Sequence, residues 1–480
     1  MKKYKLLYIL PAALLFACEP EFDDVDFNGG SADFSRTVAV GNSLSAGFQS
    51  NALSAEGQEY SLPNMIASQL KQVGGGAFLQ PIIPGDAGLK GVGLSSLLPP
   101  GLVLPEFVLR LAPDCQGTVG PAPQLASGPY SGAEFAANIS ANGPFNNIGV
   151  PGARVSNLSQ AGYGSSQGNP YFARFAGNPL ETMLEAAMKV NPTFFELWIG
   201  NNDVLGYSTS GGDDGGDAIT STTVFDADFK EALDSLTKNG AKGVVANIPY
   251  VTSIPYFTTV PAGTDAITEA QATQLNAGYA AYNAGLDGLV QVPSANLTQA
   301  EADRRKISFT AGQFNTFVVI DPTLTDLTAF NAAVINMRQI TSSELLTLTT
   351  PGDSIRCANW GTAKPIPGNF HITDAELDKI KTAIDAFNAT IKAEADARGL
   401  AYVDANARLQ ELATSGITVD GIGFSSAFVS GGAFSLDGVH LSTRGYAYIA
   451  NDFIKAINAK YAANIPSVVV SSYPAIEVAQ

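Results

Sequence analysis

Short apolar runs that suit buried strands alternate along this chain with segments that suit helices. The apolar runs occupy residues 38–40, 194–199, 243–248 and 401–404. The helical segments occupy residues 62–72, 180–188, 226–238, 373–391 and 446–457. In three of them, apolar residues recur every three or four positions, the pattern of an amphipathic helix. Strands that alternate with helices build a mostly parallel sheet covered on both faces. We therefore predict an α/β fold, with a ligand site at the carboxyl edge of the sheet.

Two long segments interrupt this alternation. Residues 74–142 are rich in Gly, Pro, Leu and Ser and show no sustained period, and residues 250–370 are irregular apart from helix-like pieces at 269–289 and 327–337. Segments of this length are usually functional or decorate a core. Although 480 residues are many for one domain, we interpret both segments as insertions into a single domain that spans residues 35–480.

The N-terminus is typical of an export signal. A basic stretch is followed by an apolar segment, residues 6–17, that is too short to cross a bilayer. The segment ends in Leu-Phe-Ala-Cys, which resembles a bacterial lipobox and predicts a lipid anchor on Cys18. Residues 1–18 are then the lipoprotein signal, and the acidic residues 19–34 are a tether to the outer membrane or cell surface. An ordinary signal peptide, a merely solvated linker and a periplasm-facing anchor stay open as alternatives.

Charge and cysteine content limit the partners. The net charge of −17 argues against nucleic acid as a partner, because nucleic acid attracts basic patches. Export places the two remaining cysteines, Cys115 and Cys357, in an oxidising compartment, where a disulfide between them is permitted.

The segment Thr37–Phe48, TVAVGNSLSAGF, places Ser43 directly after a buried strand. A nucleophilic serine needs a base within hydrogen-bond reach and a group that orients the base. The chain has two histidines, and Asp437 precedes His440 by three residues, a spacing that brings both side chains to one side of a turn. The carboxylate can then orient the imidazole and stabilise its cationic form. His371 lacks such a partner, and we predict a surface or capping role for it.

Acyl transfer also needs hydrogen-bond donors aimed at the oxygen that becomes negative. Asn202 follows a predicted strand and offers a side-chain amide, and Gly152 offers a backbone N–H that no Cβ shields. Asparagine and glycine also populate ordinary turns. The two residues gain weight because the same chain supplies Ser43 and the Asp437–His440 pair.

These stretches resemble, in order, the sequence blocks of the SGNH (GDSL-type) hydrolase family. The matching blocks are GNSLS at 41–45, GVPG at 149–152, GNND at 200–203 and DGVH at 437–440. The resemblance implies Ser43 as the nucleophile, His440 as general base and then acid, and Asp437 as its orienter. It also implies an oxyanion hole made of the backbone N–H groups of Ser43 and Gly152 and the Asn202 side chain.

The same resemblance implies a three-layer α/β/α sandwich that needs no metal or cofactor. The lipobox and the segment 248–257 point to exported lipoprotein members of Bacteroidetes-type bacteria. This chain departs from the family in having Asn42 where Asp is usual, which bears on the tuning of the site.

The sequence therefore predicts a serine esterase that cleaves carboxylic esters, of lipid or acetylated-glycan type, through an acyl-enzyme on Ser43. The alternative is a non-catalytic surface lipoprotein that uses the same scaffold to bind a glycan or a lipid. In either case, the membrane is a partner through the anchor on Cys18.

Overall fold

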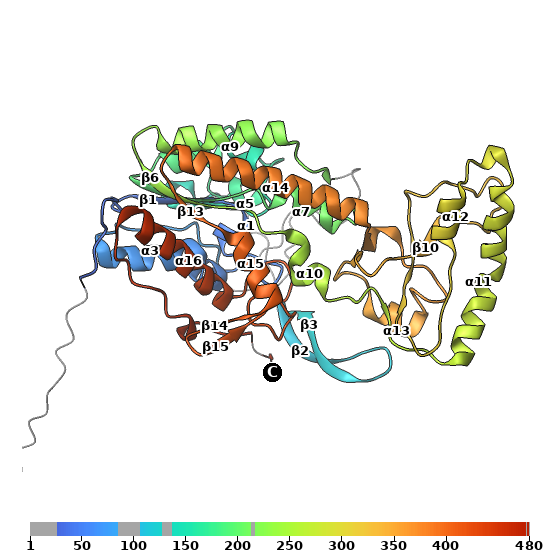
Figure 1. Cartoon of the computed structure of the whole chain (residues 1–480). Helices are drawn as coiled ribbons and strands as arrows, with labels where there is room; N and C mark the ends of the chain where they lie inside the picture. The colour runs from blue at the N-terminus through green and yellow to red at the C-terminus, as the bar shows by residue number, and fades with distance from the viewer. Residues whose placement is uncertain (1–25, 85–105, 127–136, 213–216, 477, 480) are drawn as a thin grey trace, which may run out of the picture.

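A computed structural model describes residues 26–84, 106–126, 137–212, 217–476 and 478–479, and its centre is a five-stranded parallel sheet (Figure 1). In spatial order the strands are β13 (Ala401–Val403), β6 (Lys242–Ala246), β5 (Phe194–Trp198), β1 (Thr37–Gly41) and β4 (Asn147–Gly149). The chain places β4 on one side of β1 and later adds β5, β6 and β13 on the other side. The direction of strand addition therefore reverses at β1, the position at which open α/β sheets bind ligands.

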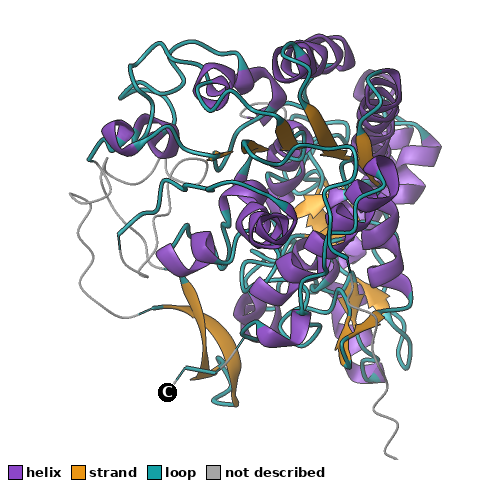
Figure 2. Cartoon of the chain, turned by 90° about the vertical axis from the view of Figure 1, so that its left-hand side faces the viewer, coloured by secondary structure: helices purple, strands orange, loops and turns teal. Residues whose placement is uncertain are grey.

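Helices cover both faces of this sheet, an arrangement compatible with the predicted three-layer sandwich (Figures 1 and 2). One face carries α3 (Leu62–Leu70) and α16 (Thr443–Tyr461), and the other carries α6 (Met183–Met188), α9 (Thr222–Thr237) and α14 (Asp374–Ala397). The predicted capping box begins α14, because the Thr373 side chain and the Glu376 side chain bond each other's backbone N–H.

Aromatic side chains join the layers. Phe225 of α9 stacks on Phe387 of α14 with ring centroids 4.0 Å apart. On the opposite face, Trp198 of β5 packs against Phe453 of α16 at 5.7 Å. The strands β1 and β5 are buried at every position, so their side chains contact helices on both sides, as expected for a parallel sheet.

The segment predicted as the second insertion forms a lobe beside the sheet, shown at the right of Figure 1. This insertion lobe, residues 263–370, contains β7 (Gly263–Thr264), α11 (Glu269–Val290), α12 (Gln299–Arg305), β8 (Asn315–Thr316), β9 (Val318–Ile320), β10 (Met337–Gln339), β11 (Leu345–Leu346) and α13 (Gly352–Ala358). It has its own apolar cores, one of them centred on Leu286, Ile307 and Leu327. Inside the lobe, buried Arg338 contacts Asp321 and Glu344. Glu344 also contacts His371, which lies just after the lobe in β12 (His371–Ile372).

The first predicted insertion contributes a β-hairpin of β2 (Phe107–Pro113) and β3 (Val119–Leu125). A disulfide between Cys115 at the hairpin tip and Cys357 in α13 joins the hairpin to the insertion lobe, so the predicted pairing is confirmed. The hairpin also pairs with the C-terminal residues, where Leu109 lies beside Val478.

The remaining elements are α2 (Ala55–Glu59), α5 (Pro170–Ala173), α10 (Pro255–Thr258), β12 (His371–Ile372), α15 (Ala405–Thr414), β14 (Ile417–Val419) and β15 (Ile422–Phe424). None of the helices in the described ranges is long and apolar enough to cross a membrane.

Three local expectations were wrong. Residues 327–337 are turns and loop that lead into β10, because Leu327 and Val334 pack into the lobe core from an irregular backbone. The helix expected at 180–188 begins only at Met183, where Thr182 supplies the N-cap, and Leu180 is exposed. His371 is buried in β12 and its Nε2 lies 3.2 Å from a Glu344 oxygen, since the ion pairs of the lobe replace the solvent that a surface histidine would need.

Candidate active site

Ser43 lies at the carboxyl edge of the sheet, as its position after an apolar run predicts. It is the first residue of α1 (Ser43–Ala46), a short helix whose N-cap, Asn42, accepts a hydrogen bond from the Leu44 N–H at 3.0 Å. Gly41 lets this turn pass close to its neighbours, because a Cβ there would lie 2.2 Å from the Ser45 hydroxyl. The loops after β4 and β5 flank Ser43, since these strands are the two neighbours of β1.

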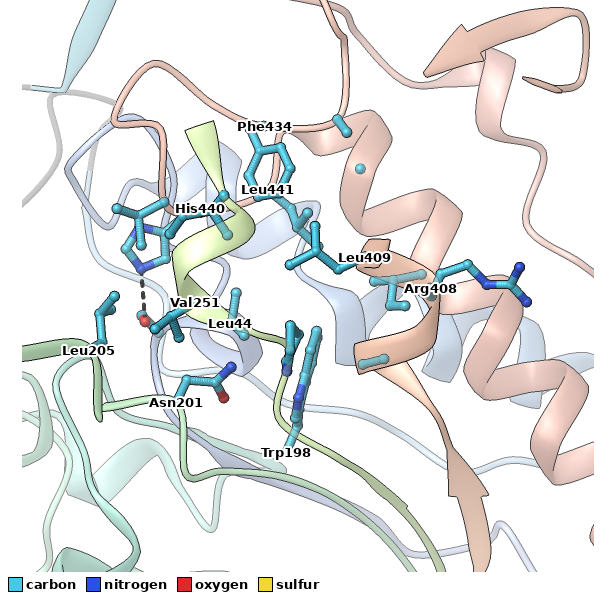
Figure 3. A pocket seen from close by; sticks show the side chains of 18 of the residues that line it. Leu44, Trp198, Asn201, Leu205, Val251, Arg408, Leu409, Phe434, His440 and Leu441 are labelled. Carbon is cyan, nitrogen blue, oxygen red and sulfur yellow. Dashed lines mark hydrogen bonds between the residues drawn. The ribbon is translucent and has the colours of Figure 1, made fainter. Parts of the chain in front are cut away.

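His440 lies between Ser43 and Asp437. Figure 3 shows the His440 ring with its hydrogen bond as a dashed line. Its Nε2 is 2.9 Å from the Ser43 Oγ, and its Nδ1 is 2.8 Å from an Asp437 oxygen. A carboxylate only accepts hydrogen bonds, so Nδ1 carries the proton and Nε2 accepts from the serine. The three side chains predicted to cooperate are therefore brought together, in the arrangement that a nucleophile, its base and an orienting acid require.

Asp437 is held by hydrogen bonds from several directions. One oxygen accepts the N–H groups of Val439 and His440, at 2.9 and 2.8 Å, and the Ser435 hydroxyl at 3.1 Å. Burial raises the pKa of Asp437, but the charge and hydrogen bonds of His440 outweigh it and bring the pKa down to about 2. Asp437 is therefore a carboxylate at neutral pH, as an orienter of imidazole must be.

The second Asp437 oxygen also accepts the Asn51 N–H at 2.8 Å, a contact that sequence reasoning missed. Ser50 and Asn51 form a tight turn in which both residues have positive φ, 48° and 69°. Left-handed backbone is costly for residues other than glycine, although asparagine tolerates it best. The Ser50 N–H binds the Ser435 hydroxyl, so the turn contacts the acid loop twice. No local sequence pattern signals this turn, because its partner lies 386 positions away.

Gly152 and Asn202 follow the strands on either side of β1, which are β4 and β5. Gly152 has a φ of +84°, a conformation that favours glycine, and it is exposed to solvent. The Asn202 amide nitrogen donates to the Ala153 carbonyl at 2.9 Å, which fixes the plane of the amide and leaves its second N–H for another acceptor. Asn202 begins α7 (Asn202–Thr209) and shares a pocket with Ser43.

The backbone N–H groups of Ser43 and Gly152 find no acceptor within the described residues. The first N–H of a helix has no partner inside that helix, which accounts for Ser43. The site thus has donors at the ends of three adjacent strands, the requirement for an oxyanion hole.

Asp203 connects two of these loops. Its side chain is fully buried and accepts the Val155 N–H at 3.0 Å, so the turn that carries Gly152 is tied to the start of α7. Burial raises the pKa of Asp203 to about 6 despite hydrogen bonds that favour its charged form. Asp203, the acidic residue of the GNND segment, therefore positions the turn that carries Gly152 relative to α7.

Asn42, the departure from the family pattern, is buried and bonded. Besides capping α1, its amide nitrogen donates to the Asn201 side-chain oxygen at 3.3 Å. An aspartate would keep the cap but would lack this donor.

A pocket opens beside Ser43 and His440 and extends toward β13 (Figure 3). The empty space between its walls is about 820 Å³, with the open solvent at its mouth included. The end of the pocket next to Ser43 and His440, which we call the catalytic end, is lined by Asn42, Asn201 and Asn202. The rest of the wall consists mainly of aliphatic and aromatic side chains. Sequence reasoning missed this pocket, because its walls come from segments between 42 and 449 that only the fold assembles.

No group of three side chains suited to holding a metal ion occurs in the described ranges. Cys18 lies outside the described residues. No protein-family model matches this chain, and a search of curated proteins found no match either.

Proposed function

We propose that this protein is a serine ester hydrolase of the SGNH type. The observation that carries the proposal is the Asp437–His440–Ser43 hydrogen-bond series, with distances of 2.8 and 2.9 Å, at the carboxyl edge of the sheet. The SGNH likeness supports the proposal, since its first three blocks lie at the ends of β1, β4 and β5 and its last block lies just before α16.

In the proposed reaction, the Ser43 Oγ attacks the ester carbonyl while His440 Nε2 takes the serine proton. The carbonyl oxygen becomes negative and is stabilised by the N–H groups of Ser43 and Gly152 and the Asn202 amide. His440 then protonates the departing alcohol, which leaves an acyl group on Ser43. Water, deprotonated by His440, releases the acid and restores the serine.

Hydrolysis of a short-chain aryl ester tests the proposal. The form that lacks residues 1–18 should release the aryl alcohol, and Ser43→Ala should abolish that release while keeping the unfolding temperature. A control change of an exposed serine, Ser343→Ala, should leave the rate unchanged. Folded protein that cleaves none of the esters would instead favour the non-catalytic binding protein.

The anchor on Cys18 and the location at the outer membrane or cell surface are part of the proposal. Their support is the lipobox-like sequence. Cys18→Ser should abolish incorporation of labelled palmitate in the native host and release the protein from membranes. Continued incorporation would contradict the assignment of Cys18.

A further inference from the structure

We infer that the pocket beside Ser43 holds the acyl chain of a fatty ester, so that the substrate is a medium-chain or longer lipid ester and not an acetylated glycan. The inference rests on the proposed esterase function. It starts from the position of the pocket, since Ser43 and His440 are part of its wall and whatever fills it is in contact with the reacting atoms.

The wall beyond the catalytic end is suited to hydrocarbon. Leu409 and Leu412 of α15, Ile449 of α16 and Phe434 supply buried apolar surface there, as Figure 3 shows for Leu409 and Phe434. Such a wall gains free energy when it excludes water with an aliphatic chain. Its hydroxyl group is that of Tyr448, which has no hydrogen-bond partner among the described residues, and one hydroxyl is few for a sugar.

The one charged group in the far wall is already neutralised. Arg408 donates to both carboxylate oxygens of Asp452, at 3.0 and 3.1 Å, and it pairs with Glu411 as well. Because these carboxylates already bind the guanidinium, Arg408 contributes mainly its aliphatic stem to the pocket wall. An anionic group in the pocket therefore gains no free positive charge from Arg408.

The pocket is also on the correct side for the acid part of the ester. The acyl group stays bonded to Ser43 after the alcohol departs, so its site must be able to hold it, whereas the alcohol needs an open path. On the β4 side of Ser43, Gly152 is exposed to solvent, whereas the apolar pocket lies on the opposite side, toward α15, which follows β13.

The test uses aryl esters that share one leaving group and differ in acyl length from acetate to octanoate. Each methylene that enters the pocket should raise kcat/KM by about fourfold, the value expected for burial of one methylene. Leu409→Trp, which fills the pocket, should lower the octanoate-to-acetate ratio of kcat/KM, and Leu409→Ala should move the optimum to longer chains. Leu180→Trp, at an exposed leucine, is the matched control and should keep the ratio.

The two experiments give different results when the acyl pocket is wrong and when the proposed esterase function is wrong. Ser43-dependent hydrolysis that is fastest with acetate and falls with chain length would overturn the acyl pocket and leave the esterase in place. If folded protein cleaves no ester, calorimetric titration of the Ser43→Ala variant with sodium octanoate tests whether the pocket binds an acyl chain. Binding that Leu409→Trp weakens supports the chain site, and absence of binding overturns it.

Discussion

Asn202 is the residue whose predicted role is tested most directly by a single change. Its amide donates to the Ala153 carbonyl and takes no part in the bond between Ser43 and His440, so removal of the side chain takes away one donor and leaves that bond in place. We expect Asn202→Ala to lower kcat by roughly 10²–10³, the usual effect of losing one oxyanion donor. Ester hydrolysis measures this, with the exposed Asn239→Ala as a control. An unchanged kcat would remove Asn202 from the site.

Asn51 holds Asp437 through its backbone N–H. Two substitutions therefore separate the effect of its backbone conformation from the effect of its side chain. Because its φ is +69°, Asn51→Gly should keep both stability and activity, whereas Asn51→Val should cost about 1–2 kcal/mol of unfolding free energy. The valine variant should also lose kcat, since the N–H that holds Asp437 moves with the turn. Denaturant unfolding and ester kinetics check both. Equal behaviour of glycine and valine would show that the turn does not position Asp437.

At the scale of the element, β5 carries a carboxyl group inside the sheet. Glu196 is 3% exposed, and neither of its carboxyl oxygens has a hydrogen-bond partner within the described residues. Burial raises its pKa well above the ordinary value. A raised folded-state pKa gives a contribution to stability that is present at low pH and is lost as pH rises, because the unfolded chain ionises first.

Glu196→Gln therefore should gain stability over the native protein as the pH rises. The difference in unfolding free energy between the two proteins should be larger at pH 8 than at pH 4, with about 1.4 kcal/mol for each unit of pKa elevation. Denaturant unfolding at the two pH values measures it, and the exposed Glu231→Gln serves as the control. A difference that does not change with pH would mean that Glu196 is ionised in the folded protein.

Elements with a strong local pattern could be predicted from the sequence. The strands β1, β5, β6 and β13 and the helices α14 and α16 all follow apolar runs or stripes, because burial acts on each of them through near neighbours in the chain. The hairpin β2–β3 could not be predicted from the sequence, because Pro121, Pro123 and two glycines obscure the alternation of apolar and polar residues.

At the scale of the whole molecule, two segments that are distant in the sequence contact the surroundings of Asp437. The hairpin arm reaches it through the Phe107 N–H, which binds the Ser50 carbonyl at 2.7 Å. On the other side, the Tyr256 N–H binds the Gly438 carbonyl at 2.9 Å, and the Leu348 N–H of the insertion lobe binds Tyr256 in turn. The Cys115–Cys357 disulfide joins these two arms at the surface.

Removal of the Cys115–Cys357 disulfide should lower the free energy of unfolding of the protein. The disulfide joins residues 242 positions apart, and we expect the double variant Cys115→Ser/Cys357→Ser to lose about 2–5 kcal/mol of stability. Thermal unfolding measures the loss. A reducing agent should lower the unfolding temperature of the native protein and leave that of the double variant unchanged. Equal unfolding temperatures for native and variant protein would contradict a stabilising role.

The sequence by itself determined the elements with a strong apolar pattern and the local spacing of the candidate site residues. Ser43 follows a strand because an apolar run ends at Gly41, and Asp437 reaches His440 because three positions separate them. Those relations are local, so patterns of a few residues contain them. Only the tertiary structure decided that His440 meets Ser43 across 397 positions, that Asn51 holds Asp437, and that α15 and α16 enclose an apolar pocket. Such contacts arise from the packing of elements distant in the chain, and that packing depends on the shapes of all of them together.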